Sequence, residues 1–498
     1  MYPLDQVLSD TPLPFLRVIA TLRGVSLQSQ RHEEVVAELA VALSDPERIA
    51  QGLAELSEGA RAALERLAAL GGHMQSAQFQ RQYGQIRPFG PGRLARERPW
   101  ESPTGPAEEL WYRGWIFRGF AQIGGAATEV VFVPEEIAAL LPSRAAPGFD
   151  VPAESAPKVI ADHGDALAHD MLTLLAMTQV EGMRIYRGQW LFGDLAQLRK
   201  RLRVVDLLDE PPAPHGRLML LCHLARRLEW VREDGERFRL KASTLRPWLE
   251  ASRGEQWAYL WRAWLEDETW DDFRLLPGLI CEGNWSTDPV GTRRRLLDWL
   301  SHWPEGRWCR LEAVVQAAKE TIPEFMRPSG DFDSWYVRDA KRGSYLRGFE
   351  HWDDLEGRVL RYMLRGPLHW MGVVALDPGG ELATVTAAGQ ALMQGRMPDV
   401  PVPHLLQVQP DFAILAPEEA PLFDRFRVAR FAEWESSPAW NVKAPYRYRV
   451  TRTSLARAQA QGIKVDQIVH FLRERAEGEG LERMVRALQR YPGRTAQR

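Results

Sequence analysis

The stretch HLLQVQPDFAILAP (residues 404–417) and the shorter APYRYRVT (residues 444–451) decide how the C-terminal part of this chain folds. In the first stretch, two apolar runs flank Gln409-Pro410-Asp411. A proline followed by an aspartate suits a tight turn, so we expect a hairpin or a bent edge strand. In the second stretch, tyrosine and valine alternate with arginine and threonine, which is the period of a half-buried strand. Residues 421–434 have apolar side chains at helical spacing and predict a helix.

Three more helices are predicted after the second stretch. Thr453 or Ser454 suits the N-cap of the first helix and Gly462 suits its end, while residues 465–475 and 481–491 would form the other two. The combination of VQPDFAILAP, YRYRVTRTSLARAQAQG and IKVDQIVHFLRE resembles the N-terminal domain of XPB-type helicases, which bacteria also carry at the end of helicase-associated winged-helix proteins. The resemblance covers about a fifth of the chain. Where the family has a proline-marked turn, residues 477–480 are Glu-Gly-Glu-Gly.

The sequence lacks the catalytic parts of such a helicase. An XPB-type motor needs a glycine-rich phosphate loop ending in Gly-Lys-Ser/Thr, and no Gly-Lys dipeptide occurs. Pro410-Asp411 followed by Asn441-Val442-Lys443 is faintly similar to a nuclease arrangement, but Asn441 stands where a second magnesium-binding carboxylate is needed. We therefore expect no enzyme, no cofactor and no metal. A nuclease with a degenerate site is the least favoured alternative.

Composition sets the wider limits. A chain of 498 residues exceeds what one hydrophobic core normally supports, so several domains are expected. No apolar run approaches the roughly 20 residues that span a bilayer, and the N-terminus does not match a secretory signal, which predicts a cytoplasmic protein without a membrane partner. The three cysteines are far apart and lack zinc-ligand spacing. The net charge is −3, and only seven of 63 basic residues are lysine, so arginine richness alone is weak evidence for DNA binding.

A pattern of strand, glycine turn, strand and capped helix occurs three times, each time after amphipathic helical stretches. The strand pairs are expected at residues 115–120 with 128–133, 228–231 with 237–240, and 368–374 with 382–385. Helices followed by a two-stranded wing are the parts of a winged helix, a variant of helix-turn-helix. The predicted fold is therefore mostly α with small β wings (α+β), with tandem winged-helix modules before the XPB-like α+β domain.

Proline-rich stretches at residues 142–158 and 396–403 mark linkers. With these linkers, the chain is expected to have four parts. They are the N-terminal helices with a first module (residues 1–142), a second module (residues 159–252), a tryptophan-rich third module (residues 253–396) and the terminal domain (residues 404–498).

A winged helix usually presents the helix before its wing to the major groove. In the second and third modules those helices carry arginines, and two denser basic clusters lie elsewhere. The predicted nucleic-acid-binding residues are Arg199, Lys200, Arg201, Arg203, Arg217, Arg226, Arg227, Arg293, Arg294, Arg295, Arg358, Arg361 and Arg365. Solvated helix faces in an arginine-rich chain have the same composition, so the pattern also fits residues without this role.

Tryptophan is unusually frequent, at 19 residues, and Trp257, Trp261 and Trp264 fall on one helical face. These three and Phe412 are the predicted partner-binding residues. A filled core between modules is the commoner explanation of such a face.

The XPB resemblance implies a scaffold that recruits or regulates a helicase. In the transcription and repair factor TFIIH, a related domain on a non-catalytic subunit with winged helices docks against the XPB one, and the layout here is similar. We expect a non-catalytic DNA-associated protein that binds double-stranded DNA, recruits a helicase or nuclease partner, or does both. The alternative is a protein-interaction scaffold without direct DNA binding, whose arginines are buried against acids.

Overall fold

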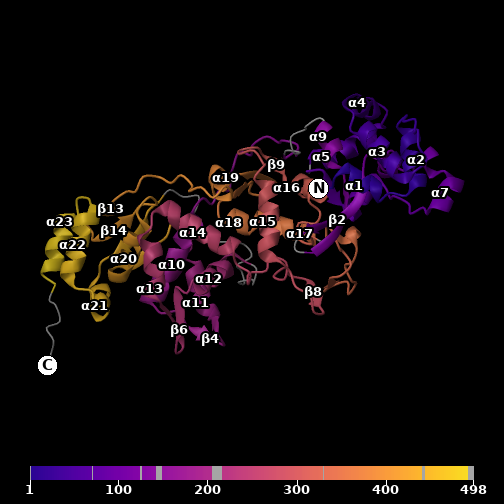
Figure 1. The fold of residues 1–498 in the computed structure, drawn as a ribbon. Helices are drawn as coiled ribbons and strands as arrows, with labels where there is room; N and C mark the ends of the chain where they lie inside the picture. The colour runs from indigo at the N-terminus through magenta and orange to yellow at the C-terminus, as the bar shows by residue number, and fades with distance from the viewer. Residues whose placement is uncertain are drawn as a thin grey trace. The chain divides into compact units, whose positions relative to one another are not determined.

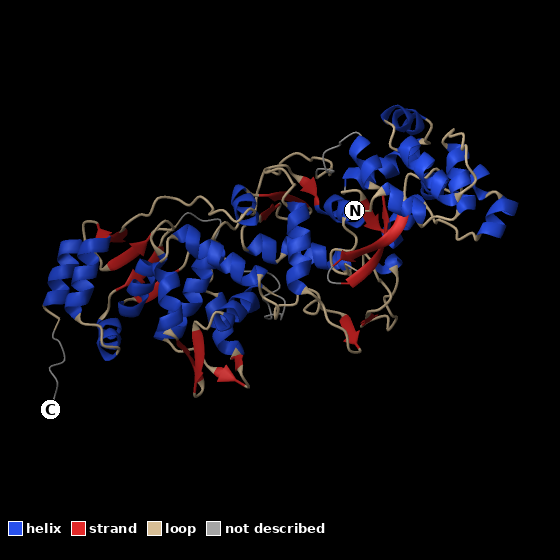
Figure 2. Ribbon diagram, viewed as in Figure 1, coloured by secondary structure: helices blue, strands red, loops and turns tan. Residues whose placement is uncertain are grey.

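A computed structural model describes most of the chain: residues 2–69, 71–123, 126–141, 149–204, 216–328, 330–439 and 444–491. The chain forms two compact units. Unit 1 comprises Met1–Asp150 and Ile322–Ser334, and unit 2 comprises Val151–Thr321 and Trp335–Arg498. Helices predominate and the sheets are small, so the fold is mixed α and β (Figures 1 and 2).

Unit 1 contains a small sheet framed by three helices. Its central elements follow the order helix, strand, helix, helix, hairpin: α5 (Glu58–Ala69), β1 (His73–Gln75), α6 (Ser76–Tyr83), α8 (Pro106–Tyr112), β2 (Phe117–Ile123) and β3 (Ala126–Phe132). The sheet order is β1-β3-β2, so the first strand lies beside the last. The other helices of the unit are α1 (Leu4–Ser9), α2 (Leu13–Leu22), α3 (His32–Leu43), α4 (Pro46–Ala54), α7 (Pro91–Glu97) and α9 (Glu135–Leu140).

Unit 2 repeats this order twice. The first copy consists of α10 (Ala166–Val180), α11 (Phe192–Arg199), α12 (Arg217–Arg227) and the hairpin of β6 (Val231–Asp234) and β7 (Arg237–Leu240). The backbone just after α10 pairs with β7, because Phe238 N donates to Met183 O (2.8 Å) and Ile185 N donates to Glu236 O (2.8 Å). A short hairpin of β4 (Ile185–Tyr186) and β5 (Gln189–Trp190) follows. Next come α13 (Ala242–Glu250) and α14 (Arg253–Leu265).

The second copy in unit 2 has the sheet order β11-β12-β9, so its first strand again lies beside the last. Its elements are α15 (Pro289–Leu300), β9 (Cys309–Arg310), α16 (Leu311–Thr321), α17 (Glu356–Arg365), α18 (Pro367–Trp370), β11 (Val374–Leu376), β12 (Leu382–Val385) and α19 (Ala387–Met393). The expected start of its hairpin at residue 368 was wrong. Residues 367–370 form the short helix α18, with Pro367 at the first helical position, which suits proline.

The linker between α16 and α17 is long and has structure of its own. Residues 322–334, expected in the third module, belong to unit 1. The following β10 (Tyr336–Asp339) returns to unit 2 and pairs antiparallel with β8 (Leu279–Glu282). Neither strand was predicted, because the place of each depends on pairing with a segment distant in sequence.

The terminal part of unit 2 is a five-stranded sheet with helices, in the strand order β15-β16-β14-β13-β17. The predicted hairpin around Pro410-Asp411 is confirmed as β13 (Leu406–Val408) and β14 (Ala413–Ala416), and the alternating strand as β16 (Tyr446–Arg449). Helix α20 (Leu422–Phe431) ends earlier than predicted, since Trp434 belongs to β15 (Glu433–Ser436). The remaining elements are α21 (Arg452–Ala460), α22 (Val465–Arg475), β17 (Ala476–Glu477) and α23 (Leu481–Gln489).

The unpredicted strand β17 ends at Glu477, the first residue of the Glu-Gly-Glu-Gly segment. It runs parallel to β13, with Leu406 opposite Ala476. Gly478 has φ +110°, and a Cβ there would lie 2.6 Å from the Val408 carbonyl oxygen. Only glycine fits this conformation and this close approach without strain. The glycines of the Glu-Gly-Glu-Gly segment therefore allow β17 to pair with β13 as an edge strand of the sheet.

Candidate nucleic-acid and partner interfaces

Three of the predicted nucleic-acid-binding arginines are buried in unit 2. Arg217 and Arg293 are fully buried and Arg203 is 7% exposed. Arg217 pairs with Asp170 at 2.7 Å, Arg293 with Asp272 at 2.7 Å, and Arg203 with Glu418 at 2.7 Å. A buried guanidinium that already has a carboxylate partner cannot reach a phosphate. The prediction for these three residues is corrected: they hold the elements of unit 2 together.

The Arg203 contact is part of a buried network that attaches the terminal sheet to α10. Arg253 pairs with Asp165 and also donates from Nη1 to the Glu418 carbonyl (2.9 Å). Arg425 of α20 donates to the His169 carbonyl (2.6 Å) and to Thr173 Oγ1 (3.0 Å), and its guanidinium lies 3.8 Å from the centre of the Tyr446 ring. The terminal part of the chain is thus fixed to the second module by charge-assisted hydrogen bonds, which are stronger than neutral ones.

Most of the remaining predicted arginines are half-buried or already bound. Arg361 forms a bidentate pair with Glu312 (2.7 Å), Arg295 pairs with Asp288 (3.3 Å), and Arg201 pairs with Glu181. Two others donate to backbone carbonyls: Arg358 to Pro277, and Arg365 to Gly380 at 3.0 Å. Arg199 is half-buried and is also engaged in a contact.

The exposed residues of the predicted set are dispersed over four helices. Arg226 and Arg227 end α12 and lie near Glu233 (3.3 Å) and Asp267 (3.7 Å). Arg365, at the end of α17, is exposed as well. Lys200 and Arg294 are exposed and have no acidic partner among the residues that the structure describes. The predicted set therefore contains few free cations.

The helices that precede the hairpins are mostly buried. Most of α12 is buried, namely Arg217, Leu218, Leu220, Leu221, Cys222, Leu224 and Ala225. Helices α17 and α8 are buried to a similar extent. On α12 and α17 only Arg226, Arg227 and Arg365, at the helix ends, are exposed, because most of the surface of these helices packs against neighbouring elements.

The β6–β7 hairpin presents cations that sequence analysis did not select. Its register places Arg232 opposite Arg239 and Asp234 opposite Arg237, while the alternate residues Val231 and Phe238 are buried. All three arginines are exposed. Arg239 pairs with Asp234 at 3.3 Å and Arg237 donates to the Glu181 carbonyl at 2.8 Å, whereas Arg232 has no acidic partner within the described parts of the chain. Like charges directly opposite each other destabilise a hairpin. The alternation in VREDGERFRL (residues 231–240) was the available signal for this cationic face.

The β4–β5 hairpin lies against the β6–β7 hairpin near the turn of the latter. Trp190 stacks on Phe238 with ring centroids 4.0 Å apart, and Arg226 donates to the Gly188 carbonyl at 2.7 Å. The two hairpins extend together from one end of the helices of this module (Figure 2). The β4–β5 turn adds exposed Tyr186 and Arg187 beside the arginines of β6–β7.

The predicted partner-binding tryptophans occupy the core of unit 2, which corrects that assignment. Trp257, Trp261 and Trp264 are 5%, 2% and 0% exposed. The Trp257 indole donates to the Met371 carbonyl (2.8 Å), and Arg293 lies 4.7 Å from the Trp264 ring centre. The filled core that the sequence also allowed is what these residues form, so none offers a surface to a partner.

Phe412 and its neighbours lie at the turn of the β13–β14 hairpin. Phe412 is half-buried with φ +64°, and the Arg483 guanidinium is 5.5 Å from its ring centre. Asp411 beside it pairs with Arg447 (2.7 Å) and Arg449 (3.1 Å). The carboxylate is therefore occupied by arginines. Asn441 and Lys443, the other residues of the nuclease-like arrangement, lie outside the described residues.

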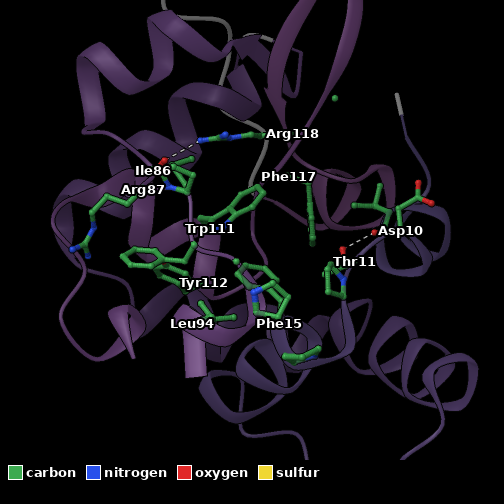
Figure 3. Close-up of a pocket in the computed structure, with 18 of the residues that line it drawn as sticks. Asp10, Thr11, Phe15, Ile86, Arg87, Leu94, Trp111, Tyr112, Phe117 and Arg118 are labelled. Carbon is green, nitrogen blue, oxygen red and sulfur yellow. Dashed lines mark hydrogen bonds between the residues drawn. The ribbon is translucent and has the colours of Figure 1, made fainter. Parts of the chain in front are cut away.

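Unit 1 has an aromatic cleft of about 610 Å³ between the N-terminal helices and β2 (Figure 3). Its lining includes four prolines and the aromatic residues Tyr2, Phe15, Phe89, Trp111, Tyr112, Phe117, Phe120 and Phe132. Arg118 crosses one wall, donating to the Ile86 carbonyl at 3.1 Å with its guanidinium 5.5 Å from the Trp111 ring centre. Phe120 at the rim is 67% exposed.

An internal ion pair fixes the loop that forms one wall of this cleft. Arg87 donates from Nε (2.7 Å) and Nη2 (2.8 Å) to the two oxygens of Glu108, which is fully buried. Burial opposes ionisation of Glu108, but the hydrogen bonds from Arg87 and Thr104 outweigh it and hold its pKa at about 2. Burial and the charge of Glu108 raise the pKa of Tyr112 to about 12. This wall of the cleft is therefore rigid and stays charged at neutral pH.

The structure offers little for metal or membrane chemistry. Within the described residues, no group of three or more His, Cys, Asp and Glu side chains lies close enough together to hold a metal ion. His223 Nε2 contacts Asp267 at 2.5 Å, which links α12 to the turn after α14. None of the described helices has both the length and the apolar character to cross a bilayer.

Comparison with known proteins adds no family. No protein-family model matches this chain, and no curated protein matches it. A function is therefore inferred from the repeated order of elements, the β6–β7 hairpin and the aromatic cleft of unit 1.

Proposed function

We propose that this chain is a non-catalytic, DNA-associated protein built from three winged-helix modules and an XPB-N-terminal-like domain. The support for the modules is the order helix, strand, helix, helix, hairpin, which occurs three times. In two of them the first strand lies beside the last, and in the other an isolated bridge joins Arg184 to Arg237 of the hairpin. The terminal domain is supported by the sequence resemblance and by the confirmed hairpin, strand and helices. We propose that this terminal domain recruits a helicase or nuclease partner by pairing along a sheet edge and by apolar packing.

The proposed DNA contact is made by the wing of the second module. The observation that carries it is the exposed face of Arg232, Arg237 and Arg239, two of which oppose each other across the hairpin. A phosphate placed between opposed arginines relieves their repulsion and gains charge-assisted hydrogen bonds. Because the helix before this wing is buried, contact through the wing favours phosphates over base edges. The binding is expected to depend little on DNA sequence.

Replacing Arg232, Arg237 and Arg239 together by glutamine is expected to weaken binding to duplex DNA and to flatten its salt dependence. Each phosphate that an arginine no longer neutralises lowers the slope of log K against log salt by about 0.9, so three phosphates correspond to about 2 to 3. The measurement is fluorescence anisotropy of a labelled random duplex at several salt concentrations. The matched control replaces exposed Arg17, Arg31 and Arg61 by glutamine. An equal weakening in both triple variants would mean that total charge, not the wing, determines binding.

The second candidate is a protein-interaction scaffold that does not touch DNA. It is favoured by the burial of α8, α12 and α17 and by the aromatic cleft of unit 1, which has the apolar lining of a peptide groove. In the same titration, absence of duplex binding by the unmodified protein at low salt would replace the first proposal by this one.

A further inference from the structure

A small two-stranded sheet in unit 2, together with the returning chain beside it, exposes an aromatic and cationic face that none of the surfaces above includes. Strand β10 pairs on one side with β8 and on the other with the returning chain, through the bridge between Arg338 and Tyr345 and the bond from Leu346 N to Val337 O (2.8 Å). Because the register is antiparallel, Arg347 lies beside Tyr336. We call this element the Tyr336 sheet; it comprises residues 279–282 and 336–347.

The two faces of the Tyr336 sheet differ sharply. Val337 and Leu346 point into the core, at 0% and 3% exposure. The alternate residues Tyr336 and Tyr345 are 47% and 48% exposed, with ring centroids 6.4 Å apart and perpendicular planes. Two large aromatic rings are thus held in fixed positions on a surface open to solvent.

Arginines lie between and beside the rings. The Arg347 guanidinium is 4.1 Å from the Tyr336 ring centre and 5.8 Å from that of Tyr345. Arg347 has no acidic partner in the described part of the chain, and its Nε is buried without a hydrogen bond. Arg338 pairs with Glu282 at 2.7 Å, and the same carboxylate accepts a hydrogen bond from the Tyr345 hydroxyl (2.7 Å). Glu282 therefore fixes one ring and one arginine, while half-buried Arg347 lies over the Tyr336 ring without an acidic partner among the described residues.

The turn at the end of the sheet adds two more cations. Asp339 accepts hydrogen bonds from the backbone N–H groups of Lys341 (2.8 Å) and Arg342 (2.7 Å), and these bonds lower the pKa of its carboxyl group. The carboxylate is thereby used for the backbone of the turn. The Lys341 and Arg342 side chains are exposed and have no acidic partner among the described residues. Four cations and two acids share this sheet in a chain whose net charge is −3.

We propose that the exposed face of the Tyr336 sheet binds unpaired nucleic-acid bases. Tyr336 and Tyr345 would each stack on a base, Arg347 would contact a base or a phosphate between them, and Lys341 and Arg342 would hold the adjoining phosphates. Aromatic rings on a sheet beside unpaired cations are the arrangement that recognises single strands. A duplex does not fit this face, because its bases are stacked on each other. This site is separate from the wing and does not depend on the duplex contact proposed for it.

The test is a titration of the full-length protein with labelled oligothymidylate and oligouridylate of about twelve nucleotides, long enough for a site of this kind. Tyr336→Leu and Tyr345→Leu are each expected to weaken binding about tenfold, because a stacked ring is removed while the apolar character stays. The double variant Tyr336→Phe/Tyr345→Phe keeps the rings and is expected to bind like the unmodified protein. Tyr259→Leu, at an exposed tyrosine of α14, is the matched control.

Two results would overturn the proposal. One is unchanged affinity in both leucine variants; the other is no oligonucleotide binding by the unmodified protein at low salt, which would leave this face to a protein partner. The wing variant separates this site from the duplex contact. It is expected to retain oligothymidylate binding while losing the duplex, and the leucine variants are expected to do the reverse. Lys341→Gln/Arg342→Gln is expected to lower the single-strand salt slope by about 1.4.

Discussion

Replacing Arg293 by methionine is expected to destabilise unit 2 by about 3 to 5 kcal/mol, the usual result of removing one partner of a buried ion pair. Arg293 Nε donates to Asp272 at 2.7 Å, and its Nη1 donates to the carbonyls of Trp264 and Asp267, both at 2.7 Å. A further bond reaches the Trp270 carbonyl. The variant would leave Asp272, which is 3% exposed, without a counter-charge. The carbonyl groups in the turn after α14 would lose the N–H groups that donate to them.

The measurement is urea unfolding followed by tryptophan fluorescence, since Trp264 and Trp270 are buried beside this arginine. Arg294→Met is the matched control, because the neighbouring side chain is exposed and such surface changes usually stay within about 0.5 kcal/mol. Adding Asp272→Leu to Arg293→Met is expected to restore part of the stability, because the unpaired charge is removed. If the two single variants unfold at the same urea concentration, the structural role assigned to Arg293 is wrong.

Raising the pH from 5 to 8 is expected to destabilise unit 1 through Glu324. Burial raises the pKa of this carboxyl group from 4.5 to about 7, against the opposing effect of Arg81 at 2.5 Å. A group whose pKa is raised in the folded state binds its proton more tightly there than in the unfolded chain. Its stabilising contribution is therefore complete below pH 4.5 and is lost as the pH rises to 7. The shift corresponds to at most about 3 kcal/mol.

The corresponding variant, Glu324→Gln, is expected to remove this pH dependence and to match the stability that the unmodified protein has at low pH. The measurement is the thermal unfolding of unit 1 between pH 5 and 8, with exposed Glu33→Gln as the control that leaves the dependence in place. A pH profile that is the same in Glu324→Gln and in the unmodified protein would show that another group titrates.

Local patterns predicted the local elements of this protein well. The turn residues Pro410-Asp411 and the alternation from Tyr446 gave the hairpin and the strand of the terminal sheet correctly, because both signals depend on neighbouring residues. Two-residue β17 has no such signal, since its place depends on pairing with β13, about 70 positions earlier in the chain. The same reason applies to β8 and β10, which meet across the third module.

The charged sites were predicted less well, because the fate of an arginine depends on acids far away in sequence. Arg293, Arg294 and Arg295 are consecutive, yet the first is buried, the second is exposed and the third pairs with Asp288. The helix turns each side chain to a different side, and only the fold brings Asp272 to the first. Selecting arginines by density therefore included buried residues and missed Arg232 and Arg347, which stand apart from the dense basic runs.

Residues 322–334 belong to unit 1, so unit 1 is completed only late in the synthesis of this chain. Gln75 Nε2 donates to the Pro328 carbonyl, and Arg81 lies 5.0 Å from the Phe332 ring centre, so this late segment completes the surface of β1 and α6. A ribosome that has finished residue 150 must still add residues 151–334 before these interactions exist. At ordinary rates of synthesis this takes on the order of ten to forty seconds. During that time Gln75 and Arg81 lack these partners, so the surface of β1 and α6 is completed only after residue 334 has been made.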